Sequence, residues 1–371
     1  MMKYNKAYKF RIYPNEEQKV LLAKTFGCVR LVYNYYLDMR IKAYEDNKQS
    51  LSYNDCAKDL ISFKKEKDYL KEVDSIALQQ SLRHLDTAYK NFFRDKKIGF
   101  PKFKSKKNHH LSYSTVCVNR NIKLEEGYLF LPKLKAVKIK QHRPIPTKYK
   151  LKSVTVSKTP TDRYYAAILY EYEAEINTVE PIKTIGLDFS MDKLFVSSEG
   201  TTADYPRYYR QSLKKLAKEQ RILSRRQKGS NRYYQQKKKI AKIHEKIANQ
   251  RKDFLHKQSR EIANLYDVIC VEDLNMQDMS QVFNFGKSVA DNGWGMFNAF
   301  LSYKLADQGK QFVKIDKWYP SSKTCHVCGD IYKELQLSER TWTCPKCNTM
   351  HNRDENASVN IKNKGLEMLS A

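Results

Sequence analysis

Two closely spaced pairs of cysteines near the end of the chain constrain its fold more than any other feature. Cys325 and Cys328 form the first pair, and Cys344 and Cys347 form the second, with fifteen residues between the pairs. Two such pairs supply the four thiolates of a tetrahedral Zn²⁺ site. Because four thiolates leave no open coordination position, we expect one structural zinc ion rather than a catalytic one.

The remaining cysteines are isolated in mixed or apolar surroundings, which is typical of buried free thiols. They are Cys28, Cys56, Cys117 and Cys270. A clustered set of thiols suits metal binding in a reducing compartment better than disulfides. The longest apolar run, residues 164–170, has seven residues, far fewer than the ~18 of a membrane span. Residues 1–6 lack the apolar core of a secretory signal, so we expect a cytoplasmic protein.

The charge of the chain narrows the class of partner. Its 371 residues include 69 Lys and Arg against 41 Asp and Glu, a formal net charge of +28. A chain this basic repels itself unless it binds a polyanion. The composition therefore argues against an ordinary small-molecule enzyme and favours nucleic acid, with an anionic membrane surface as the weaker alternative.

The first half of the chain predicts a sheet with a helical insertion. Residues 4–13 alternate with the period of a strand, and Asn15 with Gln18 forms the pattern of a capping box that begins a helix. Helical periodicity continues to about residue 95. Short strands are expected later in this half, at 128–131, 136–141, 151–156 and 164–172.

The second half predicts an α/β arrangement. Strands are expected at 184–189, 193–198, 268–271 and 312–318. Between them lie a basic helical hairpin at 206–260, with its turn near 229–231, and a helix at 294–308. A final short helix follows the cysteines.

Three acidic residues fall at the ends of these expected elements. Asp188 and Glu272 end hydrophobic strands, and Asp354 begins the last helix. A carboxylate at such a position is costly to desolvate without a compensating cation. Two Mg²⁺ ions would remove the repulsion within a shared site and suit phosphodiester displacement. Each acid alone is equally consistent with a turn residue or a helix N-terminal charge.

At these residues the chain resembles the TnpB (OrfB) family, RNA-guided nucleases carried by bacterial insertion sequences, over nearly its whole length. The motifs that carry the resemblance are Gly186-Leu187-Asp188, Val271-Glu272-Asp273-Leu274-Asn275, Ser321-Ser322-Lys323-Thr324-Cys325, Cys328-Gly329, Cys344-Pro345, Cys347, His351-Asn352-Arg353-Asp354, Asn356-Ala357 and Asn360-Ile361. Two further motifs give weaker support, Gly99-Phe100-Pro101-Lys102-Phe103-Lys104 and Leu223-Ser224-Arg225-Arg226. Phe189 and Ser190 depart from many relatives, which have Gly two residues after the first acid.

The resemblance implies a fold and a domain order. It implies an α/β nuclease domain of the RNase H-like (RuvC) class at 181–320 and 349–371, which includes the basic helical region 206–260. A zinc ribbon at 321–348 is inserted in it. A wedge β-barrel is implied at 1–14 and 96–173, carrying an α-helical recognition domain at 15–95.

The resemblance also implies a function. Asp188, Glu272 and Asp354 match the family's catalytic acids, which bind two Mg²⁺ ions. The partners would be a guide RNA from the end of the mobile element and double-stranded target DNA, which is cut beside a short flanking motif. Base pairing would supply most of the sequence choice. The setting would be the cytoplasm of a bacterium or archaeon, close to the nucleoid.

Candidate nucleic-acid contacts lie in four places. One is the basic and aromatic loop at 96–110, another is the helical hairpin close in sequence to the first acid, and two more are the last helix and the recognition segment. The residues are Lys102 and Lys104, then Arg221, Arg225 and Arg226, then Arg353, and finally Ser75, Gln79 and Gln80.

Three alternatives remain open at this point. An RNA-guided repressor would bind without cutting, although relatives of that kind have lost catalytic acids that this chain keeps. A transposase proper would join DNA ends, but the chain lacks the Tyr and His-x-His arrangement of relaxases. A compact type V CRISPR effector would share the chemistry and differ in genomic context.

Overall fold

The computed structural model describes residues 2–107, 111–281, 286–336 and 338–370. The chain divides into two compact units, Met1–Glu175 and Ile176–Ala371. None of the described helices has both the length and the apolar character that crossing a membrane requires.

The first unit contains a seven-stranded antiparallel sheet with the order β2-β6-β7-β1-β5-β4-β3. Strand β1 lies at its centre and pairs with β7 from Met2 opposite Ala174 to Ile12 opposite Tyr164. The strands are β1 Met2–Tyr13, β2 Leu111–Val116, β3 Lys123–Glu125, β4 Tyr128–Leu131, β5 Lys135–Lys140, β6 Lys150–Lys158 and β7 Tyr164–Ala174.

Helices pack on this sheet and share one hydrophobic core with it. The period-two pattern of β1 buries Tyr8, Phe10 and Ile12, as its sequence predicts. The helices are α1 Glu16–Asn47, α2 Tyr53–Glu66 and α3 Ser75–Arg94, with 3₁₀ turns η1 Asp68–Lys71 and η2 Lys96–Ile98.

The predicted capping box at the start of α1 is confirmed. The Asn15 side chain accepts a hydrogen bond from the Gln18 amide, and the Gln18 side chain accepts one from the Asn15 amide. The Gln18 side chain also donates to the carbonyl oxygen of Ala136 in β5, at 2.8 Å. The cap therefore fixes the helix to the sheet as well as starting it.

Barrel closure stays a prediction. Within the described ranges, the hydrogen-bonded order runs from β2 at one end to β3 at the other.

The second unit is built on a five-stranded sheet with the order β10-β9-β8-β11-β12. Strands β8, β11 and β12 are parallel, whereas β9 and β10 are antiparallel to their neighbours. The elements are β8 Thr184–Phe189, β9 Phe195–Ser197, β10 Thr202–Ala203, α4 Tyr208–Ser224, α5 Asn231–Leu265, β11 Val268–Glu272, α6 Met276–Gln281, α7 Gly286–Asn292, α8 Trp294–Ala306, β12 Gln311–Ile315, β13 Thr341–Thr343, β14 Met350–Asn352 and α9 Arg353–Ser370.

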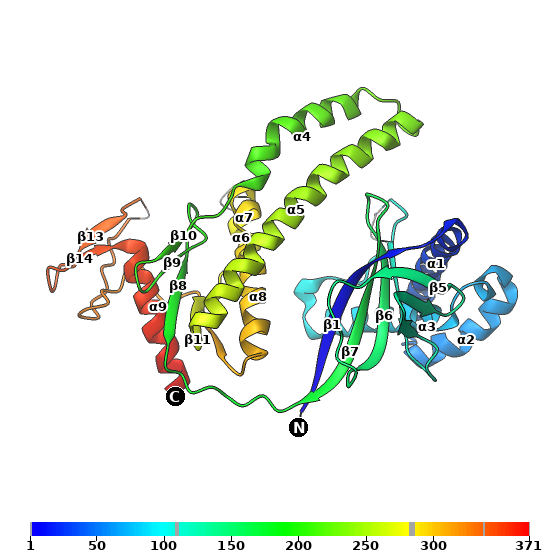
Figure 1. Ribbon diagram of the computed structural model, residues 1–371, viewed down its shortest axis with the longest axis horizontal. Coiled ribbons are helices and arrows are strands. Elements are labelled where there is room, and N and C mark those ends of the chain that lie inside the picture. Colours follow the sequence, from blue (N-terminus) through cyan, green and yellow to red (C-terminus); the bar gives the residue numbers. More distant parts are fainter. Residues whose placement is uncertain (1, 108–110, 282–285, 337, 371) are drawn as a thin grey trace. The chain divides into compact units, whose positions relative to one another are not determined.

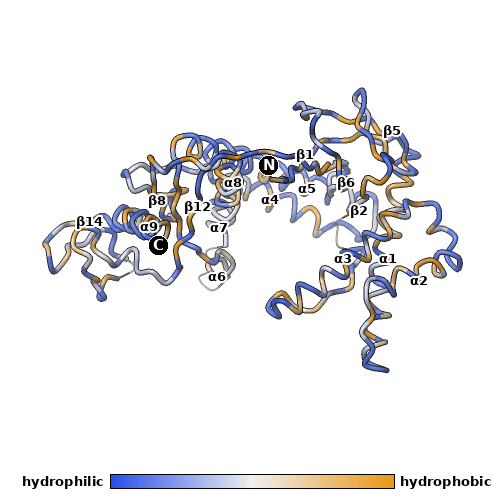
Figure 2. Tube along the Cα trace, turned by 90° about the horizontal axis from the view of Figure 1, so that it is seen from below, coloured by the Kyte–Doolittle hydropathy of each residue, from blue (hydrophilic) through white to orange (hydrophobic). Residues whose placement is uncertain are grey.

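The central strands of this sheet are buried on both faces, and their sequences are therefore continuous apolar runs. Ile185 and Leu187 pack with Leu255 of α5 and Phe297 of α8. On the other face, β11 and β12 pack with Ile361 of α9. Figure 1 shows the parallel strands between these helices, and Figure 2 shows hydrophobic residues along β8 and β12.

The helical hairpin is confirmed, with α4 ending at Ser224 and α5 beginning at Asn231. Its two arms are joined by the buried side chain of Gln236, which donates to the backbone oxygen of Glu219 at 2.9 Å and to its carboxylate at 2.6 Å.

Two expected boundaries are wrong. The strand expected at 312–318 ends at Ile315, because the Asp316 side chain accepts from the amide of Trp318 at 2.7 Å and forms a turn. The last helix is not short, since α9 continues to Ser370. Gly365 does not end it, because Gly365 is buried inside the helix against Cys270.

Candidate active site and metal centre

Asp188 and Glu272 lie side by side at one edge of the second sheet. Leu187 of β8 is in register with Val271 of β11. Because the strands are parallel, the next residues, Asp188 and Glu272, are also neighbours. The carboxyl ends of parallel strands are where α/β folds place their sites.

Helix α9 brings the third acid, Asp354, to the same edge. The helix contacts β8 directly at Gly186, where an added Cβ would overlap the carbonyl oxygen of Ser358 and lie 2.7 Å from the Lys362 amide nitrogen. A second glycine, Gly365, allows the helix to contact Cys270 of β11. This close packing explains why the first turn of α9 reaches the ends of the strands.

The three carboxylates interact electrostatically. Burial raises the pKa of Asp188 well above its ordinary value, and the negative charges of Glu272 and Asp354 raise it further. The positive charge of Arg353 opposes this rise. The structure therefore brings together the four residues predicted around this site, and the site carries an excess of negative charge.

Glu272 is held by a hydrogen bond from the hydroxyl of Ser321. Burial raises the pKa of Glu272, and the Ser321 hydrogen bond works against that rise. Asp354 has a cation nearby, because Nη1 of Arg340 lies 3.5 Å from its Oδ1. A cluster of carboxylate oxygens is the donor set that hard divalent cations prefer.

Two buried asparagines of α9 join this acidic site to the cysteine-bearing loop. The Asn360 side chain donates to the backbone oxygens of Ser321, at 2.8 Å, and Thr324, at 2.6 Å. The Asn356 side chain donates to the Thr324 oxygen at 2.7 Å and accepts from the His326 amide at 3.0 Å. Sequence reasoning gave Ser321, Asn356 and Asn360 no positioning role. The spacing of four, which places both asparagines on one helix face, was the available signal.

The four clustered cysteines converge as predicted. Their sulfur atoms all lie within 4.8 Å of one another. Each pair forms a tight turn, in which the Gly329 amide donates to the Cys325 oxygen and the Asn348 amide donates to the Cys344 oxygen, both at 2.9 Å. This Cys₄ cluster is consistent with a zinc ribbon.

A histidine that sequence reasoning did not select also contacts the cluster. Nε2 of His351 lies 3.1 Å from the Cys325 sulfur. The His351 ring is buried between Trp342 and His326, at centroid distances of 4.7 and 4.9 Å. This contact joins strand β14, which carries His351, to the cysteine cluster.

The predicted nucleic-acid contacts fall in both units. Lys102 and Lys104 line a cavity in the first unit. Ser75 and Gln79 are exposed on α3 and Gln80 is half-buried there. The loop predicted at 96–110 is described only as far as residue 107.

The three candidate arginines of the hairpin lie away from the three acids of the candidate site. Arg221 is in the last turn of α4, and Arg225 and Arg226 follow it, exposed at the tip of the hairpin. A helix of this length spans about 25 Å. Closeness in sequence to Asp188 therefore does not translate into closeness in space (Figure 1).

Sequence comparisons agree with this architecture. Residues 167–282 match the OrfB_IS605 family, described as "Probable transposase", and residues 294–361 match the Cas12f1-like TNB domain. Residues 1–49 match a helix-turn-helix domain of OrfB_IS605, although here they form one strand and one long helix. A Streptomyces pristinaespiralis protein provisionally named an RNA-guided DNA endonuclease is 36% identical, covering 99% of this chain and 90% of its own length.

The chain belongs to the TnpB (OrfB) family. InsQ of Escherichia coli (strain K12), with the same provisional name, is 32% identical and is covered over 94% of its length, with all of this chain aligned. Among solved structures, a Cas12f1–sgRNA–target DNA complex has a TM-score of 0.54 at 13% identity, covering 97% of this chain and 99% of that one. This likeness shows a shared fold, and it agrees with the predicted α/β nuclease class.

Proposed function

We propose that this TnpB-family protein is an RNA-guided DNA endonuclease that hydrolyses phosphodiester bonds at one site formed by Asp188, Glu272 and Asp354. The observation that carries the proposal is the convergence of these three carboxylates, since the charges of Glu272 and Asp354 add to burial in raising the pKa of Asp188. Bringing together acids from two strands and a helix costs free energy, because each negative charge disfavours the ionisation of the others. A cation-binding role offsets that cost.

The donor set fits two Mg²⁺ ions, which would activate water and stabilise the leaving oxygen when bound. Asp188, whose pKa is raised by both other acids, would hold the ions together with Glu272 and Asp354. Ser321 orients the Glu272 carboxylate, and Arg353 supplies a positive charge for the DNA strand.

The Cys₄ cluster fits one structural Zn²⁺ ion. Its ligands are Cys325, Cys328, Cys344 and Cys347, and the four leave no position for substrate. Through Asn356 and Asn360, the ribbon at 321–348 is joined to the helix that carries Asp354. Zinc binding would therefore stabilise the geometry of the acids as well as the ribbon.

The partners are a guide RNA from the element end and double-stranded target DNA opened beside a short flanking motif. A net charge of +28 supports binding of more than one polyanion. Residues 15–95 would form the recognition domain, with Ser75, Gln79 and Gln80 facing the flanking motif, inserted in the wedge formed by 1–14 and 96–173.

The test is to purify the protein with its co-purifying RNA, sequence that RNA, and incubate the complex with a matching plasmid and Mg²⁺. A single abundant RNA with a variable end, together with cutting of the plasmid only at matching sites, is the expected result. Protection of the site without cutting would favour a repressor, and strand-transfer products would favour a transposase. Random RNA and no site-specific cutting would contradict the proposal.

A repeat array next to the gene, rather than an element end, would make the protein a compact type V CRISPR effector with the same chemistry.

A further inference from the structure

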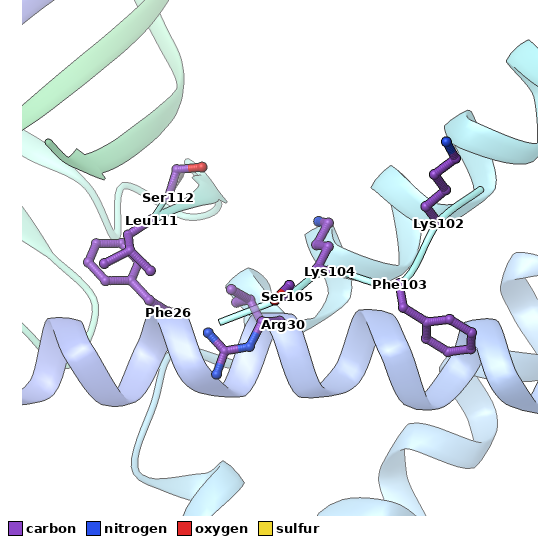
Figure 3. A pocket seen from close by; sticks show the side chains of 9 residues that line it. Phe26, Arg30, Lys102, Phe103, Lys104, Ser105, Leu111 and Ser112 are labelled. Atoms are coloured by element: carbon purple, nitrogen blue, oxygen red, sulfur yellow. The ribbon is translucent and has the colours of Figure 1, made fainter. Parts of the chain in front are cut away.

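The first unit holds a cavity of about 350 Å³ between helix α1, the segment 102–105 and the start of β2. This volume lies near the lower limit of small-molecule sites, about 300–1,000 Å³. A duplex is too wide for it, whereas one nucleotide is of suitable size. Figure 3 shows its lining side chains.

The wall of the cavity is positively charged. Arg30, Lys102 and Lys104 line it, and no Asp or Glu is among its lining residues in the described chain. Arg30 is half-buried, and neither its side chain nor that of Lys102 makes a hydrogen bond or ion pair with any residue that the structure describes. Three cationic side chains without an acidic neighbour give the wall a positive potential, so the cavity suits an anionic ligand.

The positive wall is held in a fixed position. The Lys104 amide donates to the Asn34 side chain at 2.8 Å, and that side chain donates back to the Lys104 oxygen at 3.0 Å. Nζ of Lys104 lies 3.9 Å from the centroid of the buried Tyr33 ring. Burial lowers the pKa of Lys104. Burial also lowers the pKa of His84, and the positive charge of Lys104 lowers it further.

One end of the cavity is apolar. Figure 3 shows Phe26 and Leu111 together at that end, with Ser112 beside them, whereas Arg30 and Lys104 lie further along and Lys102 lies beyond them. An apolar end, a hydroxyl group and a cationic middle correspond to the base, the sugar and the phosphate of one nucleotide. Unpaired bases bind proteins in this combination of apolar contact and phosphate contact.

We propose that this cavity binds one unpaired nucleotide of the bound nucleic acid, with its base toward Phe26 and Leu111 and its phosphate between Arg30 and Lys104. This proposal rests on the proposed function, which supplies both RNA and opened DNA as sources of the nucleotide. The test distinguishes these two sources.

The experiment measures binding without cleavage. In Mg²⁺-free buffer with a chelator, filter binding gives the Kd of the protein for its co-purifying RNA and the Kd of the RNA complex for target DNA. Ethylation interference then maps the phosphates that matter in each strand. The variants are Arg30→Ala, Arg30→Lys and Ser112→Asp, which adds a carboxylate to the wall. Lys58→Ala removes an exposed charge on α2 as the matched control.

Arg30→Ala is expected to raise one of the two Kd values about tenfold, the loss of one charge-assisted hydrogen bond. Interference at one phosphate should disappear with it. Ser112→Asp should weaken binding of the same nucleic acid, and Arg30→Lys should keep most of the affinity. Lys58→Ala should keep the interference at that phosphate. The Kd that rises, for RNA or for target DNA, identifies the source of the nucleotide.

Wild-type affinity and an unchanged interference pattern in both Arg30→Ala and Ser112→Asp would overturn the proposal. These variants should keep the wild-type Tm, since the side chain of Arg30 makes no polar contact with a described residue and Ser112 is exposed. Failure of the wild-type complex to cut DNA would contradict the nuclease proposal and leave the binding result intact. The two failures are therefore distinguishable.

Discussion

The side-chain amide of Asn360 donates a hydrogen bond of 2.8 Å to the backbone oxygen of Ser321. The hydroxyl of the same serine donates to Glu272. One serine thus connects an acid of β11 with the helix that carries Asp354, and it begins the loop that leads to Cys325. This connection makes the position of the acids depend on the cysteine-bearing loop.

Asn360→Ala should lower the cleavage rate and raise the Mg²⁺ concentration for half-maximal cutting. The substitution removes one of two donors from the backbone oxygens of Ser321 and Thr324, to which Asn356 still donates. It therefore costs about 0.5–1.5 kcal/mol of stability, and it loosens Ser321. Asn363→Ala is the matched control, because Asn363 is exposed on the same helix. Measuring the cleavage rate as a function of Mg²⁺ concentration tests this prediction. An unshifted curve would show that the hydrogen bond from Asn360 to Ser321 does not position the acids.

Asp188→Asn should abolish cleavage and yet raise the Tm of the metal-free protein at pH 7. The pKa of Asp188 is raised in the folded state by burial and by its acidic neighbours. The neutral form is therefore favoured on folding, and stability of the metal-free protein decreases as pH rises through that raised pKa. Asparagine has no charge and removes this penalty.

Thermal unfolding of both proteins, from pH 4 to pH 8 with and without Mg²⁺, measures this effect. Mg²⁺ should raise the Tm of the wild type and leave that of the variant nearly unchanged. A variant that is less stable than the wild type at pH 7 without metal would contradict the electrostatic account.

The sequence predicted the individual strands and helices of this fold better than the way in which they pair and pack. Alternation in residues 4–13 and the Asn15–Gln18 cap depend only on neighbouring residues, so β1 and the start of α1 could be predicted. The pairing of β1 with β7 joins segments about 160 residues apart in the chain, and a local pattern carries no information about it.

The same distinction holds for the site. Hydrophobic runs that end in Asp188 and Glu272 predicted two strand ends, but their register, set by Leu187 opposite Val271, is a long-range property. The convergence of Asp354 depends on a helix that lies against Gly186. Nothing in the local sequence distinguishes this glycine from one required by a turn, and only the resemblance to a known family joined the three acids.

Gly186→Ala should destabilise the second unit and reduce cleavage together. A methyl group at this position overlaps α9 at Ser358 and Lys362, and overpacking of this kind costs about 1–3 kcal/mol. Gly27→Ala is the control, since a Cβ there meets nothing within 4 Å. Denaturant unfolding and cleavage assays measure both effects, and a fully active Gly186→Ala protein of wild-type stability would refute the proposed role of the contact.

Cys344→Ser should reduce bound zinc well below one ion per chain, measured by elemental analysis, because the site loses one of its four thiolates. Residues 321–352 should then become sensitive to limited proteolysis. Cys117→Ser, which changes an isolated half-buried cysteine, should keep its zinc. Full zinc content in the Cys344 variant would exclude Cys344 as a ligand.

The most direct test of the central claim compares the wild type with Asp188→Ala, both purified with their guide RNA. Each complex is incubated with a matching plasmid and Mg²⁺, and target binding is measured in parallel without Mg²⁺. The account predicts that the variant binds RNA and target with nearly wild-type affinity and makes no cut. Cutting at the wild-type rate by Asp188→Ala would contradict it.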